Sequence, residues 1–503
     1  MSEATATVAA SSAAVLPLRA ETLVSLAGRL PVPQYDRTAV TTGVVHFGVG
    51  GFHRAHQAMI VDRLLSRGEA TDFGICGVGV LESDRRIRDV LAKQDGLYTL
   101  VVKHGDGTVD GRVIGSIVEY LFAPDDPEAV LEKLAAPATR IVSLTITEGG
   151  YNVDPLTGLF DASDAAVMRD LTSGAAPATV FGLVTEALRR RRDRAIAPFT
   201  VMSCDNIQGN GHTAAAAFTS FARLHDPDLA DWIAETVAFP NTMVDRITPV
   251  TTDADRDLVR ERFGIDDLWP VVCEPFLQWV IEDEFALGRP AYEEEGAQIV
   301  ADVEPYELMK LRLLNASHQA LAYFGYLAGY RYAHEAAADP ALARLVREYM
   351  TREAQPTLAP VPGVDLEVYK ATMLERFANP FVRDTLARLC AESSDRIPKF
   401  ILPALRDRIA AGGDVSLGAA IVASWARYDE GEDEGGQPID IVDRLKDDLT
   451  ARARRYADDP EAFVNQRSVF GELGSEERFM RPYLNALRSL HEHGSRETYA
   501  GLV

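Results

Sequence analysis

The sequence has little cysteine, no excess of basic residues and no long apolar run, and each absence narrows the class of protein. Only four of its 503 residues are cysteines, and they lie too far apart to form a metal-type pair. The formal charge of −24, with 75 acidic against 51 basic residues, argues against nucleic acid as a partner. No run of about eighteen apolar residues occurs, so we expect no membrane span. A reduced, cytoplasmic protein fits these features.

The length and composition predict at least two globular domains. Apolar residues make up 47% of the chain and charged residues 25%, which is the balance of a soluble globular protein. From about residue 43, short apolar runs such as "VVHFGV", "FGICGVGV", "RIVSLTIT" and "FTVMSC" alternate with amphipathic stretches. This alternation predicts a parallel sheet covered by helices on both faces. The first 30 residues lack a basic region ahead of their short apolar part, and we expect them to be partly a loose tail.

After about residue 303 the pattern becomes helical. Apolar residues recur three and four positions apart in successive stretches from 305–330 to 417–431. The expected fold class is therefore α/β, with a Rossmann-like doubly wound domain over residues 1–303 and a mostly α-helical domain over residues 304–503.

The stretch "VVHFGVGGFHRAHQ" predicts a nucleotide-binding turn. Three glycines follow an apolar strand directly, and a helical pattern begins within a few residues: Gly48, Gly50 and Gly51. A tight strand-to-helix turn needs unusual dihedral angles, and a pyrophosphate needs close approach to backbone N–H groups. The match to the usual glycine fingerprint is imperfect, because Phe52 and His53 stand where its last glycine belongs. We count Phe52 among the residues of this cofactor turn.

His53 and His56 raise the alternative of a metal site. They lie three residues apart and could face the same way on a helix, which is a spacing that metal sites also use. No third Cys, His or carboxylate ligand is evident nearby, whereas a catalytic zinc needs three protein ligands. We therefore expect no metal, and instead capping or contact with a phosphate or a domain interface for these histidines and Arg54.

Acidic residues at the end of the second predicted strand indicate which cofactor is used. A dinucleotide fold presents a carboxylate to the adenosine ribose at this position, and "GVGVLESDRR" supplies Glu82 and Asp84. A carboxylate here repels the additional phosphate of NADP, so NAD is the expected cofactor. Arg85 and Arg86 follow at once, and their pairing with that phosphate stays open as an alternative.

Four polar residues share one face of the helix predicted over "YELMKLRLLNASH": Glu307, Lys310, Asn315 and His318. At ~100° per residue they fall within an arc of roughly 140°. This set is either a buried polar network or a proton-transfer site. In the second case Lys310 removes a hydroxyl proton, provided that burial lowers its pKa from about 10.4 toward neutrality. Asn315, and Asn206 just past the strand "FTVMSC", can donate hydrogen bonds to the oxygen.

Several separated blocks resemble the polyol-specific long-chain dehydrogenases, the mannitol dehydrogenase family. They are "GVGGFHRAHQA", "SLTITEGGY", "FTVMSCDN", "FPNTMVDRITP", "PVVCEPFLQWVIED" and "MKLRLLNASH", and the resemblance covers roughly residues 32–503. It implies a zinc-independent, reversible, NAD-dependent oxidation of D-mannitol to D-fructose, with a small polyol or ketose as the partner and a monomeric enzyme.

The resemblance also implies roles for single residues. Lys310 matches the family's lysine base, and Asn206 and Asn315 match its two oxyanion asparagines. Glu307 matches a glutamate that relays the proton to solvent. Substrate contacts fall on His318, Asp245 and, at the far end of the polyol, Arg388. Arg396 stands where the mannitol enzymes carry a lysine beside the substrate, which leaves the choice of polyol open.

Other activities remain as alternatives. Fructuronate reductase shares the fold and the lysine–asparagine site but binds a carboxylate at the far end of its substrate, and Arg388 and Arg396 could pair with that charge. Arabinitol or sorbitol could replace mannitol for the same reason. A non-catalytic sensor of NAD or sugar is a different class, and the presence of Lys310 with both asparagines argues against it because binding requires no base.

Overall fold

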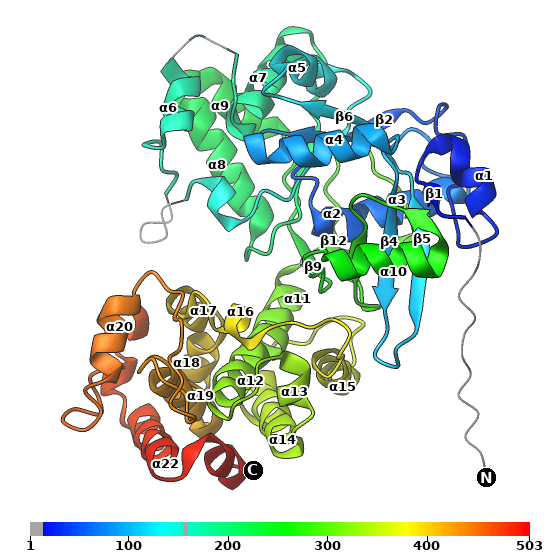
Figure 1. The fold of residues 1–503 in the computed structure, drawn as a ribbon. Helices are drawn as coiled ribbons and strands as arrows, with labels where there is room; N and C mark the ends of the chain where they lie inside the picture. Colours follow the sequence, from blue (N-terminus) through cyan, green and yellow to red (C-terminus); the bar gives the residue numbers. More distant parts are fainter. Residues whose placement is uncertain (1–13, 154–158, 173, 175) are drawn as a thin grey trace, which may run out of the picture. The chain divides into compact units, whose positions relative to one another are not determined.

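The computed structural model describes residues 14–153, 159–172, 174 and 176–503. The chain divides into two compact units, one of Met1–His104 and Thr108–Val303 and the other of Gly105–Gly107 and Glu304–Val503 (Figure 1). In these described ranges, no helix is long and apolar enough to cross a membrane.

The first unit is built on a five-stranded, fully parallel sheet. In spatial order its strands are β6 (Ile117–Phe122), β3 (Gly74–Gly79), β2 (Thr42–Phe47), β7 (Ile141–Leu144) and β8 (Thr200–Ser203). The chain runs outward from β2 to β6 on one side and then from β7 to β8 on the other, so the order reverses between β2 and β7. Ligands of doubly wound sheets bind outside the carboxyl ends of the strands at such a reversal. The expected Rossmann-like α/β class is confirmed.

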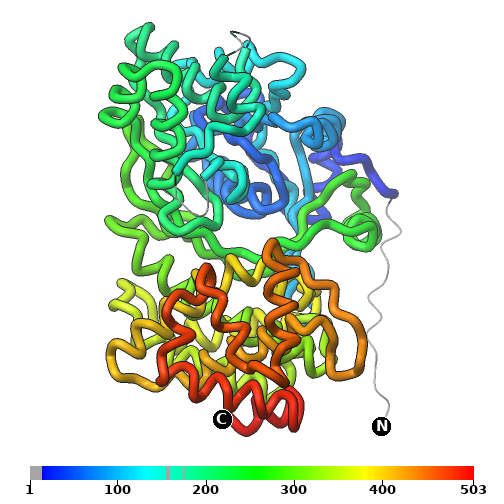
Figure 2. The backbone as a smooth tube through the Cα atoms, turned by 90° about the vertical axis from the view of Figure 1, so that its left-hand side faces the viewer, coloured from blue at the N-terminus to red at the C-terminus, as the bar shows by residue number. Residues whose placement is uncertain are grey.

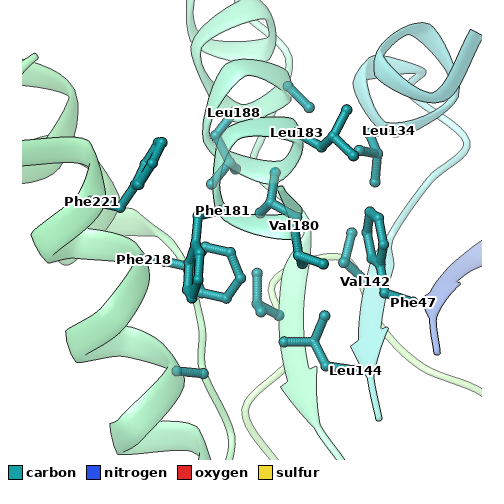
Figure 3. Close-up of a cluster of buried hydrophobic side chains, with 14 of the residues drawn as sticks. Phe47, Leu134, Val142, Leu144, Val180, Phe181, Leu183, Leu188, Phe218 and Phe221 are labelled. Atoms are coloured by element: carbon teal, nitrogen blue, oxygen red, sulfur yellow. The ribbon is translucent and has the colours of Figure 1, made fainter. Parts of the chain in front are cut away.

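Both faces of this sheet are buried, which explains its continuous apolar strands. Val45 and Phe47 of β2 belong to one hydrophobic core, and Val44 belongs to the core on the other side. In the first core, residues of β2 and β7 pack against α7 (Val180–Asp193) and α8 (Asn210–His225), as Figure 3 shows. Helix α3 (Gln57–Ser66) contributes to the second core.

Two three-stranded sheets in the first unit are not evident from the sequence pattern. One pairs β4 (Tyr98–Lys103) with β5 (Val109–Ile114) and β11 (Val271–Cys273). The other joins β12 (Gln278–Glu282) to β9 (Thr242–Asp245) and β13 (Gln298–Val300). These strands are short or mix polar with apolar residues, so none of them stands out as an apolar run.

Residues 16–30, within the segment expected to be partly a loose tail, are packed in the first unit. Strand β1 (Leu16–Pro17) pairs with β10 (Ile265–Asp266). Leu18, Leu26 and Leu30 are buried in a hydrophobic cluster with residues of β4 and β5. Leucines of this segment therefore contribute to folding, although the stretch has no strong periodicity.

The second unit is helical, as expected. Helix α12 (Ala316–Leu327) packs against α16 (Leu386–Cys390), α19 (Ser416–Tyr428) and α22 (Glu477–Gly501), the last of which is red in Figure 2. Helices α12 and α19 are buried along most of their length, and α19 is apolar on nearly every side, which suits the centre of a helical domain.

A buried carboxylate meets the start of α19. Glu353, in a π-helical turn η6 (Tyr349–Ala354), accepts the backbone N–H groups of Leu417 and Gly418, each at 2.7 Å. Its burial raises its pKa from 4.5 to about 7. The folded chain thus holds this proton more tightly than the unfolded chain. The stability that Glu353 contributes is fully present below about pH 4.5 and is lost as the pH rises to about 7.

Replacing Glu353 with glutamine should remove a pH dependence of stability worth about 3 kcal/mol. We expect the melting temperature of the wild type to fall, relative to that of Glu353→Gln, as the pH rises from 5 to 8. The control is Glu348→Gln on the preceding helix, where the side chain is 38% exposed. The melting temperature of this variant should change with pH as that of the wild type does. If the melting temperature of Glu353→Gln also followed that of the wild type across this pH range, the raised pKa of Glu353 would be contradicted.

Candidate functional site

The glycine turn after β2 combines one sterically required glycine with two open ones. Gly48 has φ +90°, and a Cβ there would lie 2.0 Å from the carbonyl oxygen of Thr145. The Thr145 hydroxyl donates to the Gly48 carbonyl at 2.6 Å. A Cβ on Gly50 would meet only the Gly48 oxygen, at 3.8 Å, and one on Gly51 only a methyl of Thr248, at 3.5 Å. The backbone of Gly50 and Gly51 is therefore open to a ligand, which fits a phosphate.

The histidines behind this turn are packing groups. The ring of His53 stacks on that of His46 with centroids 3.4 Å apart, and His56 stacks on Phe52 at 4.8 Å. Burial lowers the pKa of His46 to about 3 and that of His53 well below its usual value, so both rings are neutral. Across the described part of the chain, no three His, Cys, Asp or Glu residues are grouped so that they could hold a metal ion.

Arg54 connects the glycine turn to a loop that the sequence did not single out. In short helix α2 (Gly51–Ala55), its buried guanidinium donates to the carbonyls of Gly50, at 3.3 Å, and Trp269, at 2.7 Å. The guanidinium of Arg86 lies 4.2 Å from the centre of the Trp269 ring. Since Arg86 follows the acidic turn after β3, Trp269 links the two segments expected to hold a dinucleotide. An isolated tryptophan outside any motif gave no signal for this role.

The two carboxylates of the acidic turn after β3 have different partners. Asp84 accepts the backbone N–H groups of Val80, at 3.0 Å, and Leu81, at 2.9 Å, and so fixes the end of the strand. Glu82 is exposed and pairs with Arg85, with Nη2 and Oε2 3.0 Å apart. Arg85, one of the two arginines that kept NADP open as an alternative, is thus already engaged by a carboxylate.

The carboxyl end of β8 is organised by Asp205. This buried carboxylate accepts hydrogen bonds from the backbone N–H groups of Ile146, at 3.1 Å, and Thr147, at 2.8 Å, and from the Tyr151 hydroxyl, at 2.8 Å. It thereby joins the segments that follow β7 and β8. The next residue, Asn206, is exposed at this edge of the sheet, where the sequence predicted an amide donor.

Asp245 lies at the last position of β9 and is only 6% exposed. Asn210, the first residue of α8, holds the start of this strand: its side chain donates to the Thr242 carbonyl at 2.8 Å and accepts the Thr242 N–H at 2.9 Å. The Thr242 hydroxyl donates to the Ser203 carbonyl at 2.6 Å. These contacts tie β9 to the end of β8, which carries Asn206.

The helix with the predicted proton-transfer residues contains a π-helical turn. Helix α11 (Glu304–Met309) continues through η5 (Lys310–Asn315) into α12, and the N–H of Ala316 donates to the Leu311 carbonyl, five residues back. The expectation of a regular α-helix is wrong at this point. Because a π turn stacks residues five apart, Lys310 and Asn315 lie more nearly above one another than regular α-geometry would place them.

All four predicted residues of this helix lie on or beside the π turn. Glu307 and Lys310 are 7% and 8% exposed, and Asn315 and His318 are half-buried. The His318 ring lies 4.4 Å from the ring of Phe377. The second unit therefore holds an amine, a carboxylate, an amide and an imidazole along one irregular stretch of helix, and irregular turns of this kind are frequent at functional sites.

The structure brings Arg388 and Arg396 together. Arg396, in α17 (Ser393–Phe400), donates to the carbonyls of Arg388 and Leu389, both at 3.0 Å. The guanidinium of Arg388, on α16, binds both oxygens of Asp384, at 2.6 and 2.5 Å. Sequence reasoning missed Asp384, although its position four residues before Arg388 is a usual spacing for a helical ion pair.

The chain combines a doubly wound domain, with a glycine turn at the reversal of its sheet, and a helical domain with a buried lysine. This combination is typical of two-domain dehydrogenases. Two family models match nearly the whole chain: the mannitol dehydrogenase Rossmann domain over residues 42–294 and the mannitol dehydrogenase C-terminal domain over residues 302–491. The chain belongs to the mannitol dehydrogenase family, and it is a polyol dehydrogenase.

Relatives support this over almost the full length. Mannitol 2-dehydrogenase of Aspergillus fumigatus is 46% identical over 474 residues, which cover 93% of this chain and 94% of the relative. A solved structure of Pseudomonas fluorescens mannitol 2-dehydrogenase, a ternary complex with NAD and D-mannitol, is 44% identical, with a TM-score of 0.86 and coverage of 97% and 99%. A substrate-free D-sorbitol dehydrogenase is 39% identical, with a TM-score of 0.90 and coverage of 96% and 100%.

Proposed function

We propose that the protein catalyses the reversible, metal-independent oxidation of D-mannitol to D-fructose with NAD and acts as a monomer. The observation that carries the proposal is the 44% identity, over 97% of the chain, to a mannitol 2-dehydrogenase whose structure contains NAD and D-mannitol. In this proposal residues 1–303 form the NAD-binding domain and residues 304–503 form the substrate and catalytic domain.

The proposed cofactor contacts come from the first unit. The open backbone at Gly50 and Gly51 receives the pyrophosphate, Gly48 shapes the turn, and Phe52 lies beside it. Glu82 and Asp84 face the adenosine ribose, where their negative charge disfavours the additional phosphate of NADP. NAD held by these residues would supply the hydride acceptor for the oxidation.

Lys310 is the proposed base for the hydroxyl proton. A base must be neutral before it accepts a proton, and burial such as that of Lys310 favours the neutral form of an amine. Glu307, one helical turn earlier, relays the proton to solvent. The amides of Asn315 and Asn206 donate hydrogen bonds to the oxygen that becomes negatively charged.

The remaining proposed residues hold the rest of the polyol. His318 and Asp245 bind substrate hydroxyls, and Arg388 and Arg396 lie at the far end. Fructuronate needs a guanidinium there that can pair with a carboxylate, whereas Arg388 is already paired with Asp384 and Arg396 donates to backbone carbonyls. This arrangement favours an uncharged polyol over the sugar acid.

Parallel assays of NADH oxidation with D-fructose and D-fructuronate test the proposed activity. We expect kcat/KM for D-fructose to exceed that for D-fructuronate by about 100-fold, because a second carboxylate beside Asp384 is repelled and left without a full partner. NADPH should support little turnover. D-Sorbitol is included in the oxidation assays, since the D-sorbitol dehydrogenase similarity makes it the second candidate substrate. Turnover of D-fructuronate alone would contradict the assignment.

A further inference from the structure

The pairing of Arg388 has a consequence for the charge of the substrate. Its side chain is 58% exposed, whereas that of Asp384 is 10% exposed. The carboxylate therefore lies against the protein, and the guanidinium extends outward beyond it. Nε and Nη2 of Arg388 are the donors used by Asp384. Two parallel donors of this kind are what a substrate carboxylate would need for bidentate binding.

Two other arginines near Arg388 in the sequence, Arg396 and Arg383, also have partners within the second unit. Arg396 directs Nη1 to the carbonyls of Arg388 and Leu389. The Leu389 carbonyl also accepts the side-chain amide of Gln319 at 3.3 Å, and Gln319 directly follows His318 on α12. The Arg383 guanidinium donates to the Tyr332 hydroxyl at 2.9 Å. Arg396 and Arg383 thus each direct one donor nitrogen to a neutral partner within the unit, whereas Arg388 alone of the three is shown paired with a carboxylate.

We propose that Asp384 is a specificity-determining residue that neutralises Arg388 and so selects an uncharged polyol or ketose over a sugar acid. Arg388 keeps its remaining N–H donors for neutral hydroxyl oxygens. A carboxylate at the same place would have to displace Asp384 or lie close to it, and like charges at such a distance repel. The inference rests on the proposed role of Arg388 in substrate binding and adds to it the residue that sets the net charge there.

The test is Asp384→Asn, which keeps the size of the side chain and removes its charge. We expect the ratio of kcat/KM for D-fructuronate to that for D-fructose to rise at least about tenfold, mainly through a lower KM for the sugar acid. Asp384→Ser is assayed alongside, so that the conclusion does not depend on one variant. An unchanged ratio in folded protein of both variants would overturn the proposal.

Matched variants separate this inference from the proposed function. Asp395→Asn removes another carboxylate of the same unit, one that pairs with Arg444 at 2.9 Å, and should leave the ratio unchanged. Adding Arg388→Gln to Asp384→Asn should abolish the gain. If Arg388→Gln alone leaves KM for D-fructose and D-mannitol unchanged, the substrate role of Arg388 itself is wrong. If it raises KM while Asp384→Asn has no effect on the ratio, only the inference about Asp384 fails.

Discussion

Lys310→Ala is expected to lower kcat by about 10³-fold while NADH still binds. The substitution removes the proposed proton acceptor from the π turn in the second unit, whereas the proposed cofactor contacts belong to the first unit. Steady-state rates with D-mannitol and D-fructose measure the first effect, and titration of NADH fluorescence measures the second. A parallel loss of NADH affinity would indicate a structural role for Lys310, and full activity would refute the mechanism.

A second buried lysine provides the control. Lys370 is completely buried, and its ammonium group donates to Thr351, Gln355 and Glu367 at 2.8, 2.7 and 2.6 Å. Lys370→Ala should lower the melting temperature, because it leaves these partners without their donor. It should leave kcat of the folded protein within about twofold of the wild type, since Lys370 has no proposed part in the chemistry. Equal losses of kcat in both lysine variants would show that losing any buried amine lowers activity, which would contradict a specific role for Lys310 as the base.

The fold was predictable from the sequence in segments with a simple burial pattern, such as a strand buried on both faces or a helix with one buried face. Strands β2, β3, β7 and β8 are covered on both faces and read as short, mostly apolar runs, while α14 (Pro340–Glu348) buries Leu342, Leu345 and Val346 at helical spacing. Strands β4 and β5 mix polar with apolar residues, and β1 has two residues, so neither pattern reveals them. Local sequence carries too little information where pairing partners are distant in the chain.

The site was predictable in its residue types and less so in its geometry. The four polar residues from Glu307 to His318 lie along one helix as expected, but the π turn that shifts Lys310 toward Asn315 leaves no mark on a three- and four-residue periodicity. Similarly, the arginines at the far end were identified, whereas the pairing of Arg388 with Asp384 became clear only in three dimensions. Charge neutralisation depends on contacts that residue identity alone does not give.

Gly48→Ala is expected to destabilise the first unit by about 3 kcal/mol or more and to weaken NADH binding at least about tenfold. A methyl group at this position would lie 2.0 Å from the Thr145 carbonyl oxygen, and the φ of +90° is strained for any residue with a Cβ. The ends of β2 and β7 would have to separate to admit it. Thermal unfolding and NADH fluorescence titration measure the two effects.

Gly50→Ala separates the shape of the turn from its contact with the cofactor. Gly50 has φ −92°, and its added Cβ would meet nothing closer than 3.8 Å, so the melting temperature should stay near that of the wild type. If the pyrophosphate approaches this backbone as proposed, the same methyl group lies in its path, and NADH affinity should fall without loss of stability. Unchanged NADH affinity in Gly50→Ala would place the phosphates elsewhere, and a melting temperature as low as that of Gly48→Ala would contradict the open space beside Gly50.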